Sequence, residues 1–166
     1  MWNAAQLQQQ ADGSGPLLGL FEPGHLQFEH DRPRDRAGEP SLAEMTRAAI
    51  ARLSKHGNGY VLLVEGGRID HANHANQGRR MVGEVAAFSD AIAAVLAKVD
   101  LNETLVIVTA DHSHGLTING YPPRGNPILG VIPGSAAAAA DGKAVTTLMY
   151  ATGPGGPAKG ETRAWA

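Results

Sequence analysis

The sequence predicts an α/β fold with a mainly parallel sheet, because two apolar runs flank a helical pattern. Residues 60–64 and 105–109 are continuous apolar runs, which are typical of strands buried on both faces. Between them, apolar side chains recur every three or four residues over 77–99, which predicts an amphipathic helix. A strand, a helix and a strand in this order form a βαβ unit, whose two strands lie parallel in one sheet.

A further helix is predicted before the first of these strands. Ser41 followed by Glu44 is a capping-box signature, so we expect the helix to start at Ser41. Its apolar face would consist of Leu42, Met45, Ile50 and Leu53. Short strands are expected at 17–21 and 145–151, whereas residues 1–16 are polar without a period. The rest of the C-terminal third is rich in Gly and Pro and is predicted to be mostly loop.

The composition excludes several classes of function. A net charge of -2 gives the chain of 166 residues no general attraction to nucleic acid or to acidic membranes. No apolar run is long enough to span a membrane, and the N-terminus lacks the pattern of a signal peptide. Because the chain contains no cysteine, disulfides and thiolate metal sites are excluded. Any metal ion must therefore be held by His, Asp, Glu or backbone oxygen.

Acidic and imidazole side chains follow both predicted strands. Glu65 comes directly after the first strand, and Asp70 and His74 follow it four residues apart. Asp111 and His112 come directly after the second strand. Ligands of parallel α/β sheets bind outside the carboxyl ends of the strands. We therefore expect both clusters at the edge of the sheet where ligands bind.

These residue types favour a site for two or three metal ions. An Asp oxygen and a His nitrogen one helical turn apart can bind one zinc ion. Asp111 and His112 can converge on a second ion in a turn, and Glu65 suits a harder ion such as magnesium. Two such ions about 4 Å apart can clamp the attacking and leaving oxygens of a phosphoryl transfer. Each motif alone also fits a capped turn or a polar surface helix, so the combination carries the metal hypothesis.

The remaining histidines carry less information. His71 and His114 lie next to the candidate ligands, and the pattern fits either groups that support the site or ordinary loop residues. His25 and His30 lie in a charged loop, where a solvated side chain is expected.

At these residues the chain resembles the alkaline phosphatases. The segments "GYVLLVEGGRIDHANHANQG" and "TLVIVTADHSHGLTINGYPPRGNPILG" resemble the two metal-binding segments of that family in order and spacing. The flanking segments, from "GLFEPGHLQFEHDR" to "TTLMYATGPGG", are similar as well, so the resemblance runs over about 17–156. It implies one partial domain over 1–166 with no second domain. It also implies part of an α/β/α sandwich with a mainly parallel central sheet.

The resemblance also implies roles for individual residues. Glu65 matches the family's magnesium ligand, and His71 matches a position near the phosphate in animal-type members. For zinc, the implied ligands are Asp70 and His74 at the first ion and Asp111 and His112 at the second. A calcium site found in some members implicates Phe21 through its backbone, together with Glu22 and Glu39, where Glu39 replaces the family's Asp.

Parts of the family's machinery do not occur in this sequence. It has no Asp-Ser-Ala motif for the nucleophilic Ser, no counterpart of the phosphate-binding Arg, and no His after His114 to complete the first zinc site. The resemblance therefore implies an internal fragment of a zinc- and magnesium-dependent phosphate monoesterase, inactive by itself. The longer protein is expected to act on phosphate monoesters and to be periplasmic or secreted. A homodimer is one option for it, because the sequence does not determine the oligomeric state.

Two alternatives stay open at this point. The chain can be a complete, non-catalytic metal-binding module. It can also belong to a related hydrolase, such as a sulfatase or a phosphodiesterase, although the two metal-binding segments fit the phosphatases better.

Overall fold

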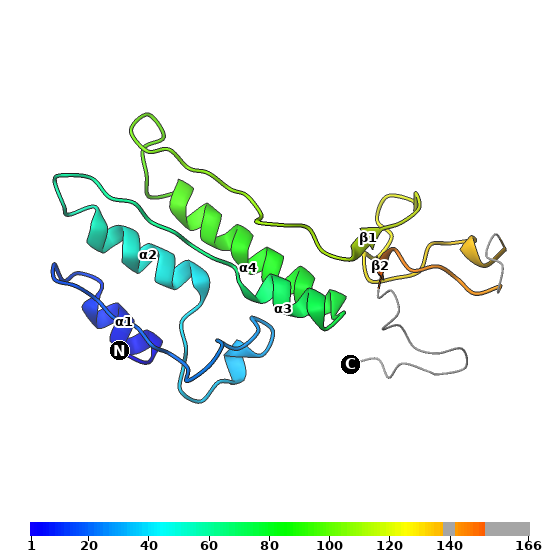
Figure 1. Cartoon of the computed structure of the whole chain (residues 1–166), viewed down its shortest axis with the longest axis horizontal. Coiled ribbons are helices and arrows are strands. Elements are labelled where there is room, and N and C mark those ends of the chain that lie inside the picture. The colour runs from blue at the N-terminus through cyan, green and yellow to red at the C-terminus, as the bar shows by residue number, and fades with distance from the viewer. Residues whose placement is uncertain (138–141, 152–166) are drawn as a thin grey trace. The chain divides into compact units, whose positions relative to one another are not determined.

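A computed structural model describes residues 1–137 and 142–151 (Figure 1). The described helices and strands are α1 (Ala4–Gln10), η1 (Arg32–Arg34), α2 (Leu42–Leu53), α3 (Arg68–His74), α4 (Gly78–Leu96), β1 (Leu116–Ile118), η2 (Ser135–Ala137) and β2 (Leu148–Tyr150). None of the helices in this described part is both long and apolar enough to cross a membrane.

The chain divides into two compact units. Unit 1 comprises Met1–His71 and Arg80–Thr109, and unit 2 comprises Ala72–Arg79 and the described residues from Ala110 onward. Each unit therefore combines segments that are distant in sequence.

Helices α2 and α4 form the core of unit 1. Its centre consists of the buried Ala43, Ala91 and Ala94, with Leu42 packed against them. Helix α2 starts as predicted, because the Ser41 hydroxyl accepts the Glu44 N–H (3.2 Å) and the Glu44 carboxylate accepts the Ser41 N–H (2.8 Å). This reciprocal cap satisfies two backbone donors that the first helical turn leaves open. The predicted helix over 77–99 is confirmed as α4.

The N-terminal segment folds onto α2 in a way that the sequence pattern does not predict. Residues 4–10 form α1, which Asn3 caps by accepting the Gln6 N–H (2.9 Å). The buried Arg52 of α2 donates to the backbone oxygens of Gln10 (2.6 Å) and Gly15. This guanidinium therefore fixes the chain that leaves α1.

The strand predicted at 17–21 is wrong. Leu18 and Leu20 are exposed, and in the part of the chain that the structure describes both pair their backbone groups with Met1 alone, at 2.9 Å each. A strand needs a ladder of hydrogen bonds along a neighbouring strand, and one residue cannot provide it.

The two apolar runs of the predicted parallel sheet do not form a sheet within the described residues. Residues 60–64 and 104–109 are drawn as elongated chain without arrows in Figure 1. In residues 1–137 and 142–151, the backbone of 60–64 and 105–108 makes no hydrogen bond to other backbone groups. The predicted strands therefore lack hydrogen-bonded neighbours here, so the predicted sandwich is not formed by the described residues.

Unit 2 contains a two-stranded antiparallel sheet. Leu116 lies opposite Tyr150, and Ile118 lies opposite Leu148. The strand predicted at 145–151 is thus confirmed as β2, whereas β1 lies in a stretch predicted to be loop. The Tyr150 hydroxyl donates to Oδ1 of the buried Asn73 (2.9 Å), which attaches the end of α3 to this sheet.

Candidate metal-binding site

Glu65, Asp70 and His71 line a cavity of about 540 Å³ in unit 1. Helix α3 begins just after the glycine pair that follows Glu65, which places Asp70 in its first turn. A Cβ atom at Gly66 would lie 3.2 Å from the Phe88 ring, which is a tight contact, so glycine eases the close approach of the chain to α4 here. The glycine pair therefore lies close to α4 just before α3, and Arg68, Asp70 and His71 of α3 line the cavity.

Arg68 and His25 hold the ring of His71 within unit 1. Arg68 Nη1 lies 3.1 Å from His71 Nδ1, and a guanidinium can only donate hydrogen bonds. This contact therefore assigns the acceptor role to Nδ1. His25 is exposed, as the sequence predicts, and its ring lies 4.3 Å from the ring of His71. Arg68 is itself held over the Phe28 ring at 3.8 Å.

Asp111 and His112 are neighbours whose side chains converge in unit 2. His112 Nε2 lies 3.4 Å from Asp111 Oδ2, and both side chains are mostly exposed. His112 Nδ1 lies 2.9 Å from the backbone oxygen of Ser113, which assigns the ring proton to Nδ1. In the neutral ring, the nitrogen that faces Asp111 is then the one with a lone pair, which is the form that binds a metal ion.

His74 and His114 lie close together in unit 2. Their ring centroids are 4.7 Å apart in an edge-to-face arrangement. His114 Nδ1 accepts the N–H of Gly115 (2.9 Å), so a neutral His114 carries its proton on Nε2. His114 is therefore a group beside the candidate ligand His74. On α3, Asp70 and His74 are one turn apart and so share one side of the helix.

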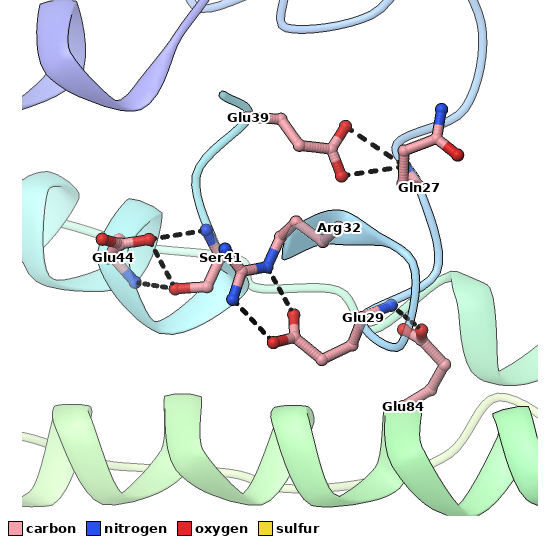
Figure 2. Close-up of polar contacts among 7 residues, drawn as sticks. All are labelled: Gln27, Glu29, Arg32, Glu39, Ser41, Glu44 and Glu84. Atoms are coloured by element: carbon pink, nitrogen blue, oxygen red, sulfur yellow. Dashed lines mark hydrogen bonds and ion pairs between the residues drawn. The ribbon is translucent and has the colours of Figure 1, made fainter. Parts of the chain in front are cut away.

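A second cluster of acidic groups lies in unit 1. Carboxylate oxygens of Glu22, Asp35 and Glu39 lie within 4.8 Å of one another. Glu39 is only 3% exposed, and both its oxygens accept the N–H of Gln27, at 2.9 and 3.1 Å (Figure 2). Burial raises the pKa of Glu39 above its usual value. Phe21, the other residue implied in a calcium site, precedes Glu22 and is half-buried.

Asp35 is the member of this cluster that sequence reasoning misses. It lies in the run "RPRDR", where a charged residue normally faces solvent. In the structure, its carboxylate accepts the N–H of Glu39 (2.8 Å), and this hydrogen bond lowers the pKa of Asp35. The contact between Asp35 and Glu39 depends on the turn that the chain makes between these two residues, which the sequence pattern does not predict.

The loop that carries this cluster is attached to α4 by polar contacts. Figure 2 shows Glu84 of α4 accepting the N–H of Glu29 (2.5 Å) and Glu29 binding Arg32 through two hydrogen bonds of 2.7 Å. Glu84 is buried, and burial raises its pKa above the usual value. These contacts fix one wall of the cavity, which both Glu29 and Glu84 line.

Comparison with known proteins agrees with the resemblance. The sequence profile described as "Alkaline phosphatase" matches residues 1–164. The tissue-nonspecific alkaline phosphatase of the cat (Felis catus) is 44% identical over 156 residues, which cover 93% of this chain and 29% of the relative. The human (Homo sapiens) isozyme is 44% identical over 139 residues, with 84% and 26% covered, and the alkaline phosphatase of cod (Gadus morhua) is 42% identical over 139 residues, with 84% and 28% covered.

The chain belongs to the alkaline phosphatase family. Membership assigns it an α/β fold and places it in a family of metal-dependent hydrolases. Similarity to alkaline phosphatases begins at residue 1, earlier than the start at 17 that the sequence predicts. The chain spans between a quarter and a third of the length of these relatives.

Proposed function

We propose that this chain supplies part of the metal centre of an alkaline phosphatase that hydrolyses phosphate monoesters. The proposed ligands are Asp70 and His74 for one zinc ion, Asp111 and His112 for a second zinc ion, and Glu65 for magnesium. The observation that carries this proposal is the separation of 3.4 Å between His112 Nε2 and Asp111 Oδ2. In the longer protein, these groups would belong to an α/β/α sandwich whose parallel sheet includes 60–64 and 105–109.

The donor atoms suit the proposed ions. Zinc binds imidazole nitrogen and carboxylate oxygen at about 2.0–2.1 Å in tetrahedral geometry, which separates two ligand atoms by roughly 3.3 Å. The spacing at Asp111 and His112 is close to that value. The assigned tautomer of His112 supports the same role, because its backbone partner holds Nδ1–H and directs Nε2 toward Asp111. Glu65 offers the oxygen that magnesium prefers.

When bound, zinc supplies Lewis-acid activation of the attacking and leaving oxygens. The proposed role of the chain's own residues is to bind the metal ions and to orient the side chains around them. His71 lines the cavity beside Asp70, and the contact of Arg68 with Nδ1 orients its ring. The nucleophile and the phosphate-binding Arg have no counterpart in this sequence, so we propose that residues outside it provide them. Measurable phosphatase turnover by residues 1–166 alone would contradict this assignment.

Zinc binding by the chain tests the proposed ligands directly. We expect His112→Ala to weaken zinc binding at least 10-fold, because an imidazole ligand is lost from one site. Competition against a chromophoric chelator measures the affinity. Asp70→Ala should lower the affinity of the other site independently.

The matched control is His56→Ala, which removes an exposed imidazole just after α2. This variant should bind zinc like the unaltered chain. Equal losses in His56→Ala and His112→Ala would refute the ligand assignment.

We also propose that Glu22, Asp35 and Glu39 bind calcium, with Phe21 contributing its backbone oxygen. The support is the convergence of three carboxylates, one of them buried with a raised pKa. Carboxylate and carbonyl oxygens are the ligands that calcium prefers. Among the described residues, the Gln27 N–H donates to Glu39, and three carboxylates lie close together at this position.

Removing one carboxylate should lower calcium affinity at least 10-fold. Isothermal titration of Glu22→Gln with calcium measures this loss, and Glu103→Gln is the control because Glu103 is an exposed acid outside the cluster. Unchanged calcium binding in Glu22→Gln would exclude this cluster as the site.

A further inference from the structure

The segment that carries His74 ends helix α3 in a tight turn. The N–H of Gln77 donates to the backbone oxygen of Ala72 (2.9 Å). The N–H of Asn76 donates to the backbone oxygen of Asn73, also at 2.9 Å. Asn76 has a φ of 55°, so these two hydrogen bonds form a Schellman motif with Asn76 in the left-handed position. His74 is the last residue of α3 before this turn, so the motif restrains the backbone that carries its ring.

Both ends of this turn contact strand β2 of unit 2. At the first end, the Tyr150 hydroxyl donates to Oδ1 of Asn73 (2.9 Å), and Asn73 is only 7% exposed. Burial raises the pKa of Tyr150 above its usual value, so the hydroxyl keeps its proton at neutral pH and can donate. At the other end, a Cβ atom at Gly78 would lie 3.6 Å from Leu148 and 3.8 Å from the Tyr150 ring, which are ordinary van der Waals contacts. The chain on either side of His74 is therefore attached to one strand.

The same end of β2 contacts the segment that carries His114. The N–H of Ala151 donates to the backbone oxygen of Gly115 (2.7 Å). A Cβ atom at Gly115 would lie 2.9 Å from the backbone oxygen of Ala151, which is closer than side chains come to backbone, so glycine is needed here. Ala151 therefore holds the residue after His114, and its neighbour Tyr150 holds the residue before His74.

We propose that Tyr150 is a positioning residue, which acts through Asn73 to hold the ring of His74 against the ring of His114 and so prepares His74 to bind zinc. The observation that carries this proposal is the edge-to-face contact of the two rings, whose centroids are 4.7 Å apart. The inference rests on the proposed function, because His74 has an ion to bind only if the zinc site exists.

A fixed ring matters because metal ligands have to lie within about 0.5 Å and 10–20° of the binding geometry. The contact with His114 restricts the rotation of the His74 ring, so less freedom is lost when an ion binds. Without the Tyr150 hydroxyl, Oδ1 of the buried Asn73 would lose this donor, and the end of α3 would shift to regain one. The His74 ring would then leave its place beside His114.

A general role of Tyr150 in stabilising unit 2 leads to a different expectation. Asp111 and His112 also belong to unit 2. Partial unfolding of this unit would therefore weaken both proposed zinc sites. Positioning by Tyr150 should weaken only the site that includes His74.

The test measures the two zinc sites separately in the chain of 166 residues. In the His112→Ala background, zinc binding reports on the site that includes His74. In the Asp70→Ala background, it reports on the site of Asp111 and His112. We expect Tyr150→Phe to weaken binding about 10-fold in the first background and to leave it unchanged in the second, as competition with a chromophoric chelator measures. Equal losses in both backgrounds would overturn the proposal in favour of the general role.

Nuclear magnetic resonance of the metal-free chain gives a readout that does not depend on zinc. We expect cross-peaks between the ring protons of His74 and His114 in the unaltered chain and their loss in Tyr150→Phe. The matched control is Tyr121→Phe, which removes the hydroxyl of a fully exposed tyrosine and should keep the cross-peaks and both zinc affinities. Cross-peaks that persist in Tyr150→Phe would overturn the proposal.

A double-mutant cycle tests whether Tyr150 acts through Asn73. Asn73→Ala should cause the same loss of zinc affinity as Tyr150→Phe, and the double variant should lose no more than either single variant. Losses that add up in the double variant would show that the two residues act independently, which would contradict the proposed route.

The two readouts separate this inference from the proposed function. If the unaltered chain bound no zinc, the proposed metal site would be refuted, whereas loss of the ring cross-peaks in Tyr150→Phe would still support the positioning of His74. If the chain bound zinc and Tyr150→Phe kept both the cross-peaks and the affinity, the metal site would stand and the positioning role of Tyr150 would be refuted.

Discussion

At the scale of single residues, the spacing of side chains in the sequence predicts the candidate ligands, whereas only the structure shows which other residues contact them. Asp111 and His112 are adjacent in sequence, so their convergence at 3.4 Å depends on one turn of the chain. Asp35 and His25 could not be predicted in the same way. Their partners, Glu39 and His71, are brought close by the path of a loop that carries no periodic pattern. Sequence patterns therefore predict contacts between side chains in the same turn or helix, but not contacts that depend on the path of an irregular loop.

Glu84 should make the stability of unit 1 depend on pH. Burial raises its pKa above the usual 4.5, so between pH 4.5 and the raised pKa the folded state binds a proton that the unfolded state has lost. The free energy of unfolding should therefore fall as the pH rises through this interval. Glu84→Gln should flatten this dependence and stabilise the chain at neutral pH by about 1 kcal/mol or less.

Urea unfolding at several pH values between 4.5 and 7.5 measures both effects of Glu84→Gln. Glu103→Gln is again the control, since an exposed acid should leave the dependence unchanged. A dependence that is as steep in Glu84→Gln as in the unaltered chain would assign the pH effect to another group, such as the buried Glu39.

At the scale of elements, the helices with local signals form as predicted. The capping box at Ser41 and the apolar period of α4 are both encoded within a few residues, and both helices appear at the expected places. Helix α1 lacks an apolar period, and Arg52 donates hydrogen bonds to Gln10 at the end of this helix and to Gly15 beyond it. The strand predicted at 17–21 failed because its composition favours a strand but provides no partner.

Removing the cap of α2 should destabilise unit 1. Ser41→Ala deletes the hydroxyl that accepts the Glu44 N–H, and losses of this kind cost about 1 kcal/mol. Chemical unfolding followed by circular dichroism measures the loss. Ser54→Ala is the matched control at the other end of α2, because the exposed Ser54 hydroxyl makes only a contact of 3.5 Å to Ala51. If both variants lost the same stability, the capping box would not be the cause.

At the scale of the whole chain, the sequence predicts the α/β class and the family. Of the two strands that pair in the structure, it predicts β2 but not β1. The apolar runs at 60–64 and 105–109 are predicted as strands because their side chains are suited to burial, and the described residues do not pair them. Sheet formation depends on hydrogen-bonded partners distant in sequence, which no local pattern specifies. The only strands that pair within the described residues are β1 and β2, and β1 carries no signal that a sequence pattern detects.

The hydrogen bond between Tyr150 and Asn73 has a consequence for the order of folding. It joins residues 77 positions apart, and β1 and β2 likewise meet across an insertion of about thirty residues, so unit 2 has a high contact order. Closing loops of this length costs chain entropy before any contact is gained. The local helical turns of α2 and α4 avoid this cost. We therefore expect α2 and α4 to form early, and the segment that carries Asp111 and His112 to become ordered last.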